Sequence, residues 1–503
     1  MSLTLQAVKN VSATWLGLLV HAVVGFFLSP FILHRLGDEA FSLWILIFVL
    51  TGYYGLLDLG IRSSIVKYTA KFVATKDEDQ LSRFLSTSLG FYGTVAVVVL
   101  LVSAVGFFHL DLWFKIPAEL LRSARILFLL AGASVALAFP LGLFAGVLEG
   151  LQKFAWLQLS QIGVTLLRAF LIVIALTSGG GLLAIGIITV ATSLLTYLIF
   201  TWMALRTLPV RLSLRNMEGK AFRIMAHYGV FAFAILAAEK LRFQSDAMVI
   251  GAFLSSTAIT SFSIGSKLVD YSSYAVRGMS QIFAPMSSQF HAVGDLVRLR
   301  QTFVAGNRAC AFIIFPFCVT LIILGKPIIE AWVGAKYLAS YSILVVLIVP
   351  RSIYLAQSTS TRILLGMGRH HVLALVLLLE GAVNLVLSLF LVRRFGILGV
   401  AWGTAIPLAC TSLIFLPRHL CRELDMPLRT FLTQAYRLPL ALCVPLTGML
   451  WFINHQFPAH GDGVLLQIAC GGVVYLVGLG AVVLNGFSGP VSWQEFARVL
   501  EPK

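Results

Sequence analysis

The sequence predicts an all-α, polytopic membrane protein with about fourteen transmembrane helices. Of its 503 residues, 59% are hydrophobic and only 12% are charged, and the mean hydropathy is +0.93. A soluble domain carries about 25% charged residues. The apolar residues also gather in runs of about 20, which is the length that crosses the hydrocarbon core as a helix. These observations exclude the soluble classes of protein.

Each predicted span is an apolar run between polar or charged connectors. The seventh and eighth spans are the least apolar, and we infer them from their length and from the short connector SSTA between them. In chain order the predicted spans are 11–33, 42–60, 84–108, 123–147, 155–177, 182–205, 224–250, 258–284, 305–325, 340–362, 372–392, 397–417, 435–454 and 464–485.

The distribution of Lys and Arg predicts the orientation. If the N-terminus is cytoplasmic, the connectors on its side carry 22 Lys and Arg residues and those on the other side carry 8. Cytoplasmic loops are enriched in Lys and Arg, so we expect both termini to be cytoplasmic. The formal net charge of +16 then follows mainly from topology, and nucleic acid is not an expected partner.

An internal repeat divides the chain. Segments of the first half align with later segments at nearly constant offsets of 218 and 216 residues. The aligned positions are 34–44 with 252–262, 70–84 with 288–302, 147–154 with 363–370, Gly150 with Gly366, and Gly180 with Gly396. We therefore expect two six-helix lobes, 1–215 and 216–430, followed by two further helices in 431–503. Six helices in each lobe give a parallel repeat, an architecture suited to alternating access.

Ionisable residues stand at helical spacing on the two spans within 224–290. Glu239, Arg242 and Asp246 follow i, i+3, i+7 on the seventh span, which predicts a single face. The eighth span carries a longer stripe of Lys267, Asp270, Tyr274, Arg277 and Gln281. Each charge costs about 2.5–3.5 kcal/mol at bilayer depth, so we expect a polar cavity. Buried salt bridges that only fix helix packing are the alternative.

Polar stripes on other spans favour the cavity. They are Gln158, Gln161, Thr165 and Arg168; Arg351, Tyr354, Ser358 and Thr361; Glu380, Asn384 and Ser388; and Asn10, Thr14 and His21. Intramembrane Lys and Arg outnumber Asp and Glu by seven to four. A surplus of cations at low dielectric attracts an anion, and Arg pairs well with phosphate. The predicted substrate-binding residues are Arg168, Arg242, Lys267, Arg277 and Arg351. For Arg277, snorkelling to the interface is an alternative.

Four intramembrane carboxylates are candidates for ion coupling. Glu380 has no cation within one turn of its own helix, which makes it the first candidate for a proton or Na⁺ site. Glu239 and Asp246 flank Arg242, so we expect them to serve mainly as its structural partners. Asp270 is the fourth candidate for ion coupling.

No pattern predicts catalysis, a metal site or a cofactor. The six cysteines form no CxxC pair and the ten histidines form no HExxH motif. Only H⁺ or Na⁺ is expected as a coupling ion. A membrane glycan polymerase or ligase would carry a large outer loop with catalytic residues, whereas the longest predicted outer connector, around 109–122, is short.

Five motifs carry a resemblance to a known family. They are LGDEAFSLW, GLLDLGIRSSIVKYTAKF, GVLEGLQKF, QSDAMVIGAFL and SIGSKL. Together they resemble the polysaccharide-transporter branch (Wzx-type O-antigen or repeat-unit flippases) of the multidrug/oligosaccharidyl-lipid/polysaccharide (MOP) exporter superfamily. The resemblance covers about the first 420 residues. It implies a MATE-like fold of two helical lobes around a central cavity, and it implies no fixed set of catalytic residues.

The resemblance also implies a function. Such proteins export an undecaprenyl-pyrophosphate-linked oligosaccharide across the bacterial inner membrane by alternating access, and the pyrophosphate would suit a cationic interior. The expected partners are this lipid-linked glycan, the bilayer and other polysaccharide-assembly proteins. A lipid II flippase and a MATE-type drug or metabolite antiporter are the alternatives within the superfamily.

Overall fold

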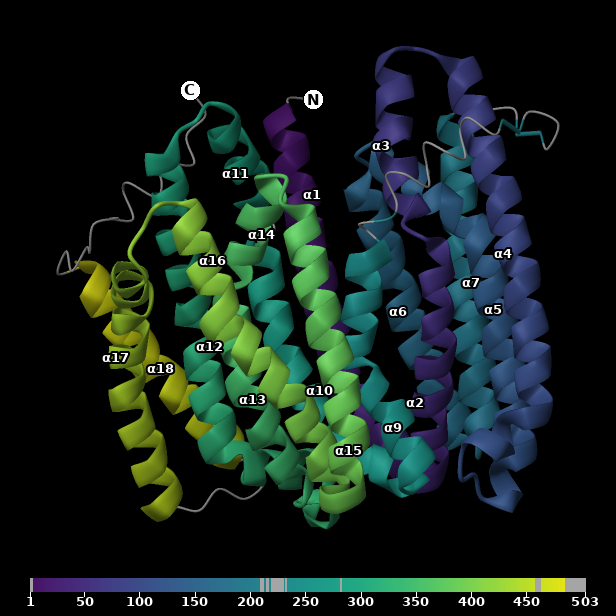
Figure 1. The fold of residues 1–503 in the computed structure, drawn as a ribbon. Coiled ribbons are helices and arrows are strands. Elements are labelled where there is room, and N and C mark those ends of the chain that lie inside the picture. Colours follow the sequence, from purple (N-terminus) through teal and green to yellow (C-terminus); the bar gives the residue numbers. More distant parts are fainter. Residues whose placement is uncertain are drawn as a thin grey trace. The chain divides into compact units, whose positions relative to one another are not determined.

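The protein is entirely helical over the residues that the computed structural model describes (Figure 1). The described residues are 3–208, 212–213, 217–218, 230, 233–280, 283–456 and 463–484. The chain forms two compact units, Met1–Thr260 and Ser261–Lys503, and each is described by itself. The predicted all-α, multi-pass membrane class is confirmed.

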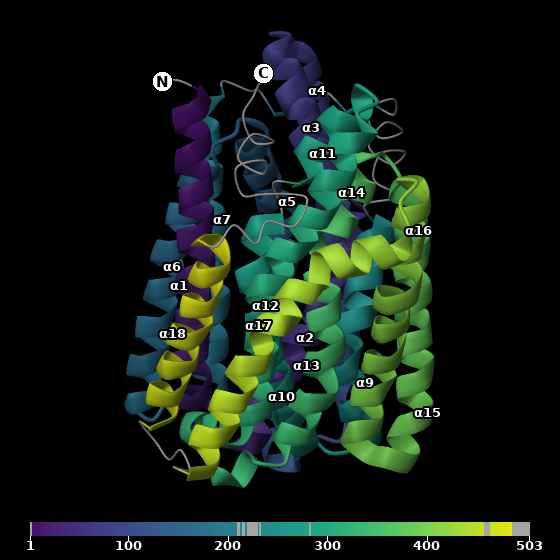
Figure 2. The ribbon, with the colours of Figure 1, turned by 90° about the vertical axis from the view of Figure 1, so that its left-hand side faces the viewer.

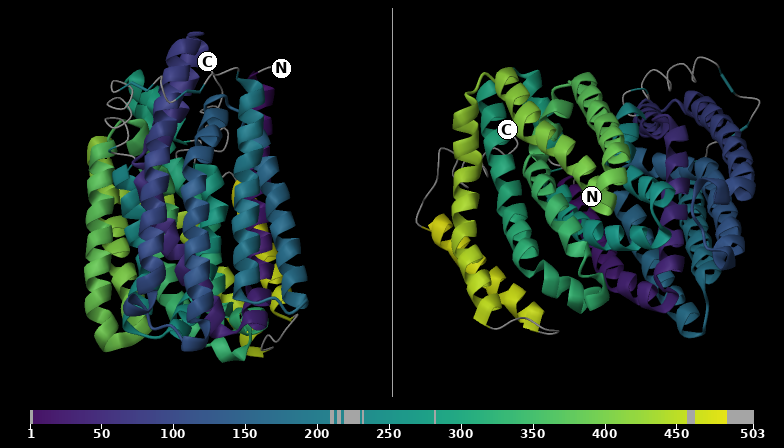
Figure 3. Two further views of the ribbon diagram at one scale, coloured as in Figure 1. Left: turned by 90° about the vertical axis from the view of Figure 1, so that its right-hand side faces the viewer. Right: turned by 60° about the horizontal axis from the view of Figure 1, so that its bottom comes forward.

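Unit 1 is a bundle of long apolar helices. Its elements are α1 (Leu3–Leu36), α2 (Asp38–Gly52), the 3₁₀ helix η1 (Tyr53–Asp58), α3 (Ile61–Ala74), α4 (Glu78–Trp113), α5 (Ala118–Gly150), α6 (Phe154–Thr177), α7 (Leu182–Thr207), the helical residues 233–243, α9 (Ser245–Phe253) and the start of α10 (Ser256–Ser280). The buried core lies among α3, α4, α5 and α7 and is rich in aromatic rings. The left view of Figure 3 shows α4 beside α5.

Unit 2 contains most of α10 and the helices that follow it. They are α11 (Phe283–Ala292), α12 (Leu296–Val333), the 3₁₀ helix η3 (Ala335–Tyr337), α13 (Ser340–Ala356), α14 (Ser358–Gly366), α15 (His370–Cys410), the π-helical turn η4 (Thr411–Phe415), α16 (Leu416–Glu423), α17 (Leu428–Gln456) and α18 (Gly463–Leu484). Figure 2 shows α17 and α18 alongside α12. Phe303 of α12 stacks on Phe431 of α17 with ring centroids 4.1 Å apart, and the Tyr475 hydroxyl of α18 donates to the Phe312 carbonyl of α12 at 2.8 Å, which joins both helices to α12.

The element α15 is a hairpin of two antiparallel arms (Figure 1). At Gly396 the backbone has φ 57° and ψ −133°, a conformation open to glycine and strained for other residues. Residues before the turn contact residues after it: Leu391 lies against Gly399, and Ser388 lies against Gly403. A Cβ on Gly403 would lie 2.7 Å from the backbone nitrogen of Ser388, so the arms touch backbone to backbone there.

The number of spans is not fixed by helix length and apolarity. By these criteria the described residues hold ten helices able to cross a membrane, or eleven if α13 and α14, bent by 41°, form one span. One of the ten, His370–Glu423, contains the α15 hairpin and therefore two arms. The predicted seventh and eighth spans, 224–250 and 258–284, are not among the ten, and both include residues outside the described ranges. The count of fourteen stays a prediction.

The internal repeat reappears in the local structure of each unit. Asp77 caps α4 by accepting a bond from the Gln80 backbone N–H, and Asp295 caps α12 through the Arg298 N–H. These positions differ by 218 residues. The turns before both caps have the same backbone hydrogen bonds at that offset, and those after α5 and α14 match at an offset of 216.

Glycine packing follows the same repeat. A Cβ on Gly150 would meet Val66 and Thr69, and a Cβ on Gly366 would meet Ala284 and Ser287. Each of these partners lies 218 residues after its counterpart. The lobe limits 1–215, 216–430 and 431–503 stay predictions, because most residues from 209 to 232 lie outside the described ranges.

Candidate functional site

A buried arginine in unit 2 lies at the centre of a polar group that we call the α10–α13 cluster: Arg351, Asp270, Ser273 and Tyr354. Arg351 is only 6% exposed. Its Nη2 donates to the Ser273 hydroxyl at 3.2 Å and lies 3.5 Å from Oδ1 of Asp270. Its Cζ is 5.5 Å from the centroid of the Tyr354 ring, within cation–π range. The structure therefore brings two predicted site residues, 81 positions apart in sequence, into contact.

The Asp270–Arg351 pair is not a sealed salt bridge. The Asp270 side chain is 60% exposed, while the Arg351 side chain is buried. On the same helix, half-buried Lys267 precedes Asp270 by one turn, and exposed Arg277 follows it by two turns. The three cations outnumber the one carboxylate, so this face of α10 and α13 has the charge to attract an anion. Gln281, predicted for the same stripe, lies outside the described residues.

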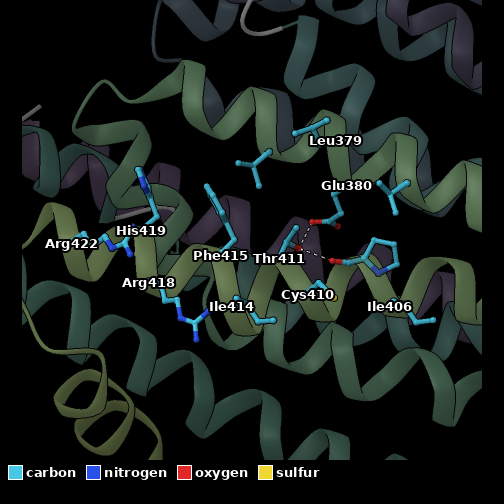
Figure 4. Close-up of a pocket in the computed structure, with 13 residues that line it drawn as sticks. Leu379, Glu380, Ile406, Cys410, Thr411, Ile414, Phe415, Arg418, His419 and Arg422 are labelled. Atoms are coloured by element: carbon cyan, nitrogen blue, oxygen red, sulfur yellow. Dashed lines mark hydrogen bonds between the residues drawn. The ribbon is translucent and has the colours of Figure 1, made fainter.

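Glu380 lies at a cavity formed by the α15 hairpin, η4 and α16, which we call the hairpin pocket (Figure 4). Its volume is about 560 Å³, and its lining residues are Val376, Leu379, Glu380, Val383, Ile406, Pro407, Cys410, Thr411, Ile414, Phe415, Arg418, His419 and Arg422. Glu380 is 4% exposed and accepts a hydrogen bond from the Thr411 hydroxyl of the opposite arm. The Glu380 carboxyl is thus held beside the apolar side chains Leu379, Val383 and Ile406 of the pocket lining.

The rest of the predicted Glu380 stripe forms a polar seam between the two arms. Asn384 and Ser388 are buried, and the Asn384 side-chain oxygen accepts bonds from Ser388 at 3.1 Å and from Thr404 at 3.4 Å. Hydroxyl and amide groups commonly join membrane helices in this way. For Asn384 and Ser388 the structure therefore supplies a packing role.

In unit 1, Arg168 is held by hydroxyl groups of the neighbouring helix. Its Nε donates to Thr192 at 2.8 Å and its Nη2 donates to Ser193 at 3.1 Å, which joins α6 to α7. Arg168 is half-buried, and neither of these hydrogen-bond partners carries a charge that would neutralise it. These two bonds therefore satisfy donors of Arg168 without neutralising its charge.

The predicted face of Glu239, Arg242 and Asp246 is interrupted, so its geometry was wrong. The helical residues 233–243 end at Gln244, which is a turn, and α9 begins at Ser245. Lys240 Nζ donates to the Gln244 side chain at 2.7 Å across this break. Asp246 therefore belongs to a different helical element from Glu239 and Arg242.

The three predicted residues consequently have different surroundings. Glu239 is exposed, whereas Asp246 is buried and Arg242 is only 1% exposed. The Arg242 guanidinium carbon lies 4.7 Å from the centroid of the Phe243 ring. Arg242 is thus a buried residue packed on a neighbouring ring, which favours a structural over a ligand-binding role.

The sequence reasoning missed a second polar network in unit 1. The Tyr92 hydroxyl donates to Asp58 at 2.5 Å, and Arg62 pairs with Glu149 at 2.7 Å. Asp58 ends η1 before Leu59 and Gly60, both in the left-handed region. The charged motif around DLGIR was the available signal.

No metal site is found in the part of the chain that the structure describes, where no three His, Cys, Asp or Glu side chains are grouped to hold an ion. The six cysteines are free thiols. The polar groups described above combine cationic donors in the α10–α13 cluster with a buried carboxyl at the hairpin pocket.

Comparisons with known proteins match this chain to a protein family, to curated relatives and to solved structures. Residues 36–342 match a family model described as "Polysaccharide biosynthesis protein". The chain is 18% identical over 434 residues to the "Putative O-antigen transporter" of Shigella flexneri, covering 83% of this chain and 99% of that protein. It is 21% identical over 430 residues to the "Uncharacterized membrane protein EpsK" of Bacillus subtilis (strain 168), covering 82% and 83%.

Solved structures share the fold. The lipid II flippase MurJ in an inward closed conformation superposes with a TM-score of 0.74 at 16% identity, covering 96% of this chain and 100% of that chain. An inward-facing MATE family multidrug transporter of the MOP superfamily gives a TM-score of 0.66 at 13% identity, covering 82% and 96%. The predicted MATE-like fold is confirmed.

Proposed function

This chain belongs to the polysaccharide biosynthesis protein family that its residues 36–342 match, as the predicted resemblance indicated, and we propose that it is a lipid-linked glycan flippase. Its substrate is an undecaprenyl-pyrophosphate-linked oligosaccharide, the repeat unit of an O-antigen or exopolysaccharide. It exports this lipid across the bacterial inner membrane by alternating access, with both termini cytoplasmic. The names of the Shigella relative and of the MurJ structure support this proposal.

The observation that carries the proposal is the surplus of cations in the α10–α13 cluster. A pyrophosphate needs donors with geometry that suits its oxygens, and a guanidinium offers two parallel N–H groups. The 3.5 Å contact between Arg351 and Asp270 is longer than the about 2.7–2.9 Å of a strong charge-assisted bond, so a phosphate oxygen can compete for it. Lys267 and Arg277 add charge on the same helix.

Glu380 is proposed as the residue that couples transport to an ion gradient. It combines burial, a bond to Thr411 and a place at the wall of a cavity, which together allow a carboxyl to take up and release H⁺ or Na⁺. Asp246 and Asp270 are the other buried or paired carboxylates of the predicted set. Glu239 is exposed and is the weakest candidate.

The test is a reconstitution assay. The full chain would be placed in liposomes with a short-chain polyprenyl-pyrophosphate oligosaccharide, and arrival of the glycan in the opposite leaflet would be followed with and without a pH or Na⁺ gradient. Parallel liposomes would contain lipid II or a soluble amphipathic drug. Movement of the oligosaccharide lipid supports the proposal. Movement of lipid II alone or of the drug alone would replace it with the corresponding alternative.

No covalent chemistry is proposed. In the cell the glycan lipid must be built on one side of the membrane and polymerised or transferred on the other. We therefore expect other polysaccharide-assembly proteins as partners, through supply and removal of the substrate.

A further inference from the structure

The walls of the hairpin pocket are apolar and face outward from the two arms. Leu379 on the first arm is 58% exposed, and Ile414 on η4 is 49% exposed. The segment that holds them, His370–Glu423, contains an 18-residue stretch with a mean hydropathy of 2.4, so we expect hydrocarbon around it. A cavity of about 560 Å³ lies within the usual ligand-pocket range of roughly 300–1,000 Å³.

One end of the pocket is basic. Figure 4 shows Arg418, His419 and Arg422 gathered at one end of the row of lining residues, with Ile406 at the other end. Arg418 and Arg422 are exposed and stand one turn apart on α16, whose Leu416 and Leu420 are buried. The two guanidinium groups therefore lie on the same side of the helix.

The nearby acid is engaged with other residues. Glu423 pairs with Arg369 at 3.0 Å and lies 3.9 Å from the His419 ring, which itself stacks on Phe415. Arg418 and Arg422 are thus left facing the pocket mouth, in a region that the Lys and Arg distribution predicts to be cytoplasmic. Basic groups beside membrane helices on the cytoplasmic side attract anionic lipid headgroups.

Glu380 and Thr411 make the middle of the pocket compatible with an acyl chain. The carboxyl accepts the Thr411 hydroxyl bond, so a hydrocarbon chain passing it does not have to replace that bond. Apart from this pair and the basic end, the residues that line the pocket are apolar. The pocket as a whole is a long apolar groove with two guanidinium groups at its mouth.

We propose that the hairpin pocket binds an anionic phospholipid of the bilayer, with one acyl chain in the groove along the outward-facing side of the two arms of α15 and the phosphate against Arg418 and Arg422. A single-chain apolar groove that ends in two cations matches a fatty chain that ends in a phosphodiester. The proposed transport substrate binds elsewhere, because the α10–α13 cluster shares no residue with the pocket. The phospholipid is therefore a bound lipid of the transporter, and its site is separate from that of the proposed transport substrate.

The test is a lipid titration of the purified full chain by native mass spectrometry, with phosphatidylglycerol and phosphatidylcholine of the same acyl chains. Wild type is expected to retain phosphatidylglycerol at least 10-fold more tightly. Each Arg near a membrane surface is worth about a 5-fold change in affinity, so R418Q/R422Q is expected to lower phosphatidylglycerol binding about 25-fold. The matched control is R393Q/R394Q, which removes two exposed charges at the opposite end of the same hairpin and should change binding less than 2-fold.

Two further arms locate the acyl chain and identify the occupant. Cys410→Phe fills the pocket from an exposed position and is expected to weaken both phospholipids. A phosphatidylglycerol with a photoreactive acyl chain should cross-link to residues 376–383 or 406–415. The single variant R418Q, with an unfolding temperature equal to wild type, replaces the double variant if the latter does not fold.

Three results would overturn the proposal. Equal affinities for the two phospholipids would show that the headgroup is not recognised. Equal losses of phosphatidylglycerol affinity in R418Q/R422Q and R393Q/R394Q would show that the headgroup does not bind at Arg418 and Arg422. Loss of the cross-link when an equimolar polyprenyl pyrophosphate is present before and during irradiation would assign the pocket to the cargo. None of these results depends on whether the glycan lipid is transported.

Discussion

Gly366→Ala tests the close helix crossing that repeats in both units. Gly366 is the last residue of α14, and a Cβ there would lie 2.6 Å from the Ala284 carbonyl oxygen and 2.9 Å from the Ser287 Cβ. Real Cβ atoms do not approach so closely, and the carbonyl oxygen belongs to the backbone, so it cannot rotate away. Helices α11 and α14 must therefore separate.

The expected magnitude is a balance of two effects. Overpacking a tight interior costs about 1–3 kcal/mol, and we expect the upper part of this range because backbone must move. Replacing Gly by Ala in a helix gains up to about 1 kcal/mol. The free energy of unfolding should therefore fall by about 1–2 kcal/mol.

The assay is thermal unfolding of the purified protein in detergent, with Gly448→Ala as the matched control. Gly448 lies within α17, and nothing lies within 4 Å of its Cβ position, so this variant should be as stable as wild type or more stable. Gly150→Ala should resemble Gly366→Ala, because its Cβ would lie 2.8 Å from the Val66 carbonyl oxygen. Equal unfolding temperatures for all three variants would refute the close crossing.

Three other variants probe separate features. Glu380→Gln can still accept the Thr411 bond but cannot exchange an ion, so flipping should persist without a gradient and lose its gradient dependence; unchanged dependence in the liposome assay would remove Glu380 from coupling. Phe431→Ala deletes a fully buried ring stacked on Phe303 and should lower the free energy of unfolding by about 3–5 kcal/mol, whereas a thermal melt like that of wild type would contradict this packing. Asp295→Ala removes the N-cap of α12 and should cost about 1 kcal/mol, a loss that Asp295→Ser should largely restore in the same melt.

Much of the fold is predictable because its signals are local. Apolar runs of membrane length give the long helices, and the acid after each short turn gives the caps at Asp77 and Asp295. The repeat was detectable from sparse matches because a turn needs a few specific residues, such as the small Gly150 and Gly366 at helix crossings. The MATE-like class followed from motifs between residues 36 and 268.

The features that sequence reasoning missed depend on contacts between distant residues. A helical stripe shows which residues share one helix, but it cannot show that Arg351 reaches Asp270 or that Thr411 reaches Glu380. The break at Gln244 was missed because no Pro or Gly marks it. The hairpin pocket needs both arms of α15 and the π-helical turn, so no single segment predicts it.

The most direct measurement is the rate at which Arg351→Gln flips a short-chain polyprenyl-pyrophosphate oligosaccharide in liposomes, compared with wild type and with Arg393→Gln. A hydrogen bond to a charged group is worth about 1.5–3 kcal/mol, so loss of the Arg351 guanidinium should slow flipping at least 10-fold while Arg393→Gln stays within 2-fold of wild type. Flipping by Arg351→Gln at the wild-type rate, in protein that unfolds at the wild-type temperature, would contradict pyrophosphate binding by the α10–α13 cluster.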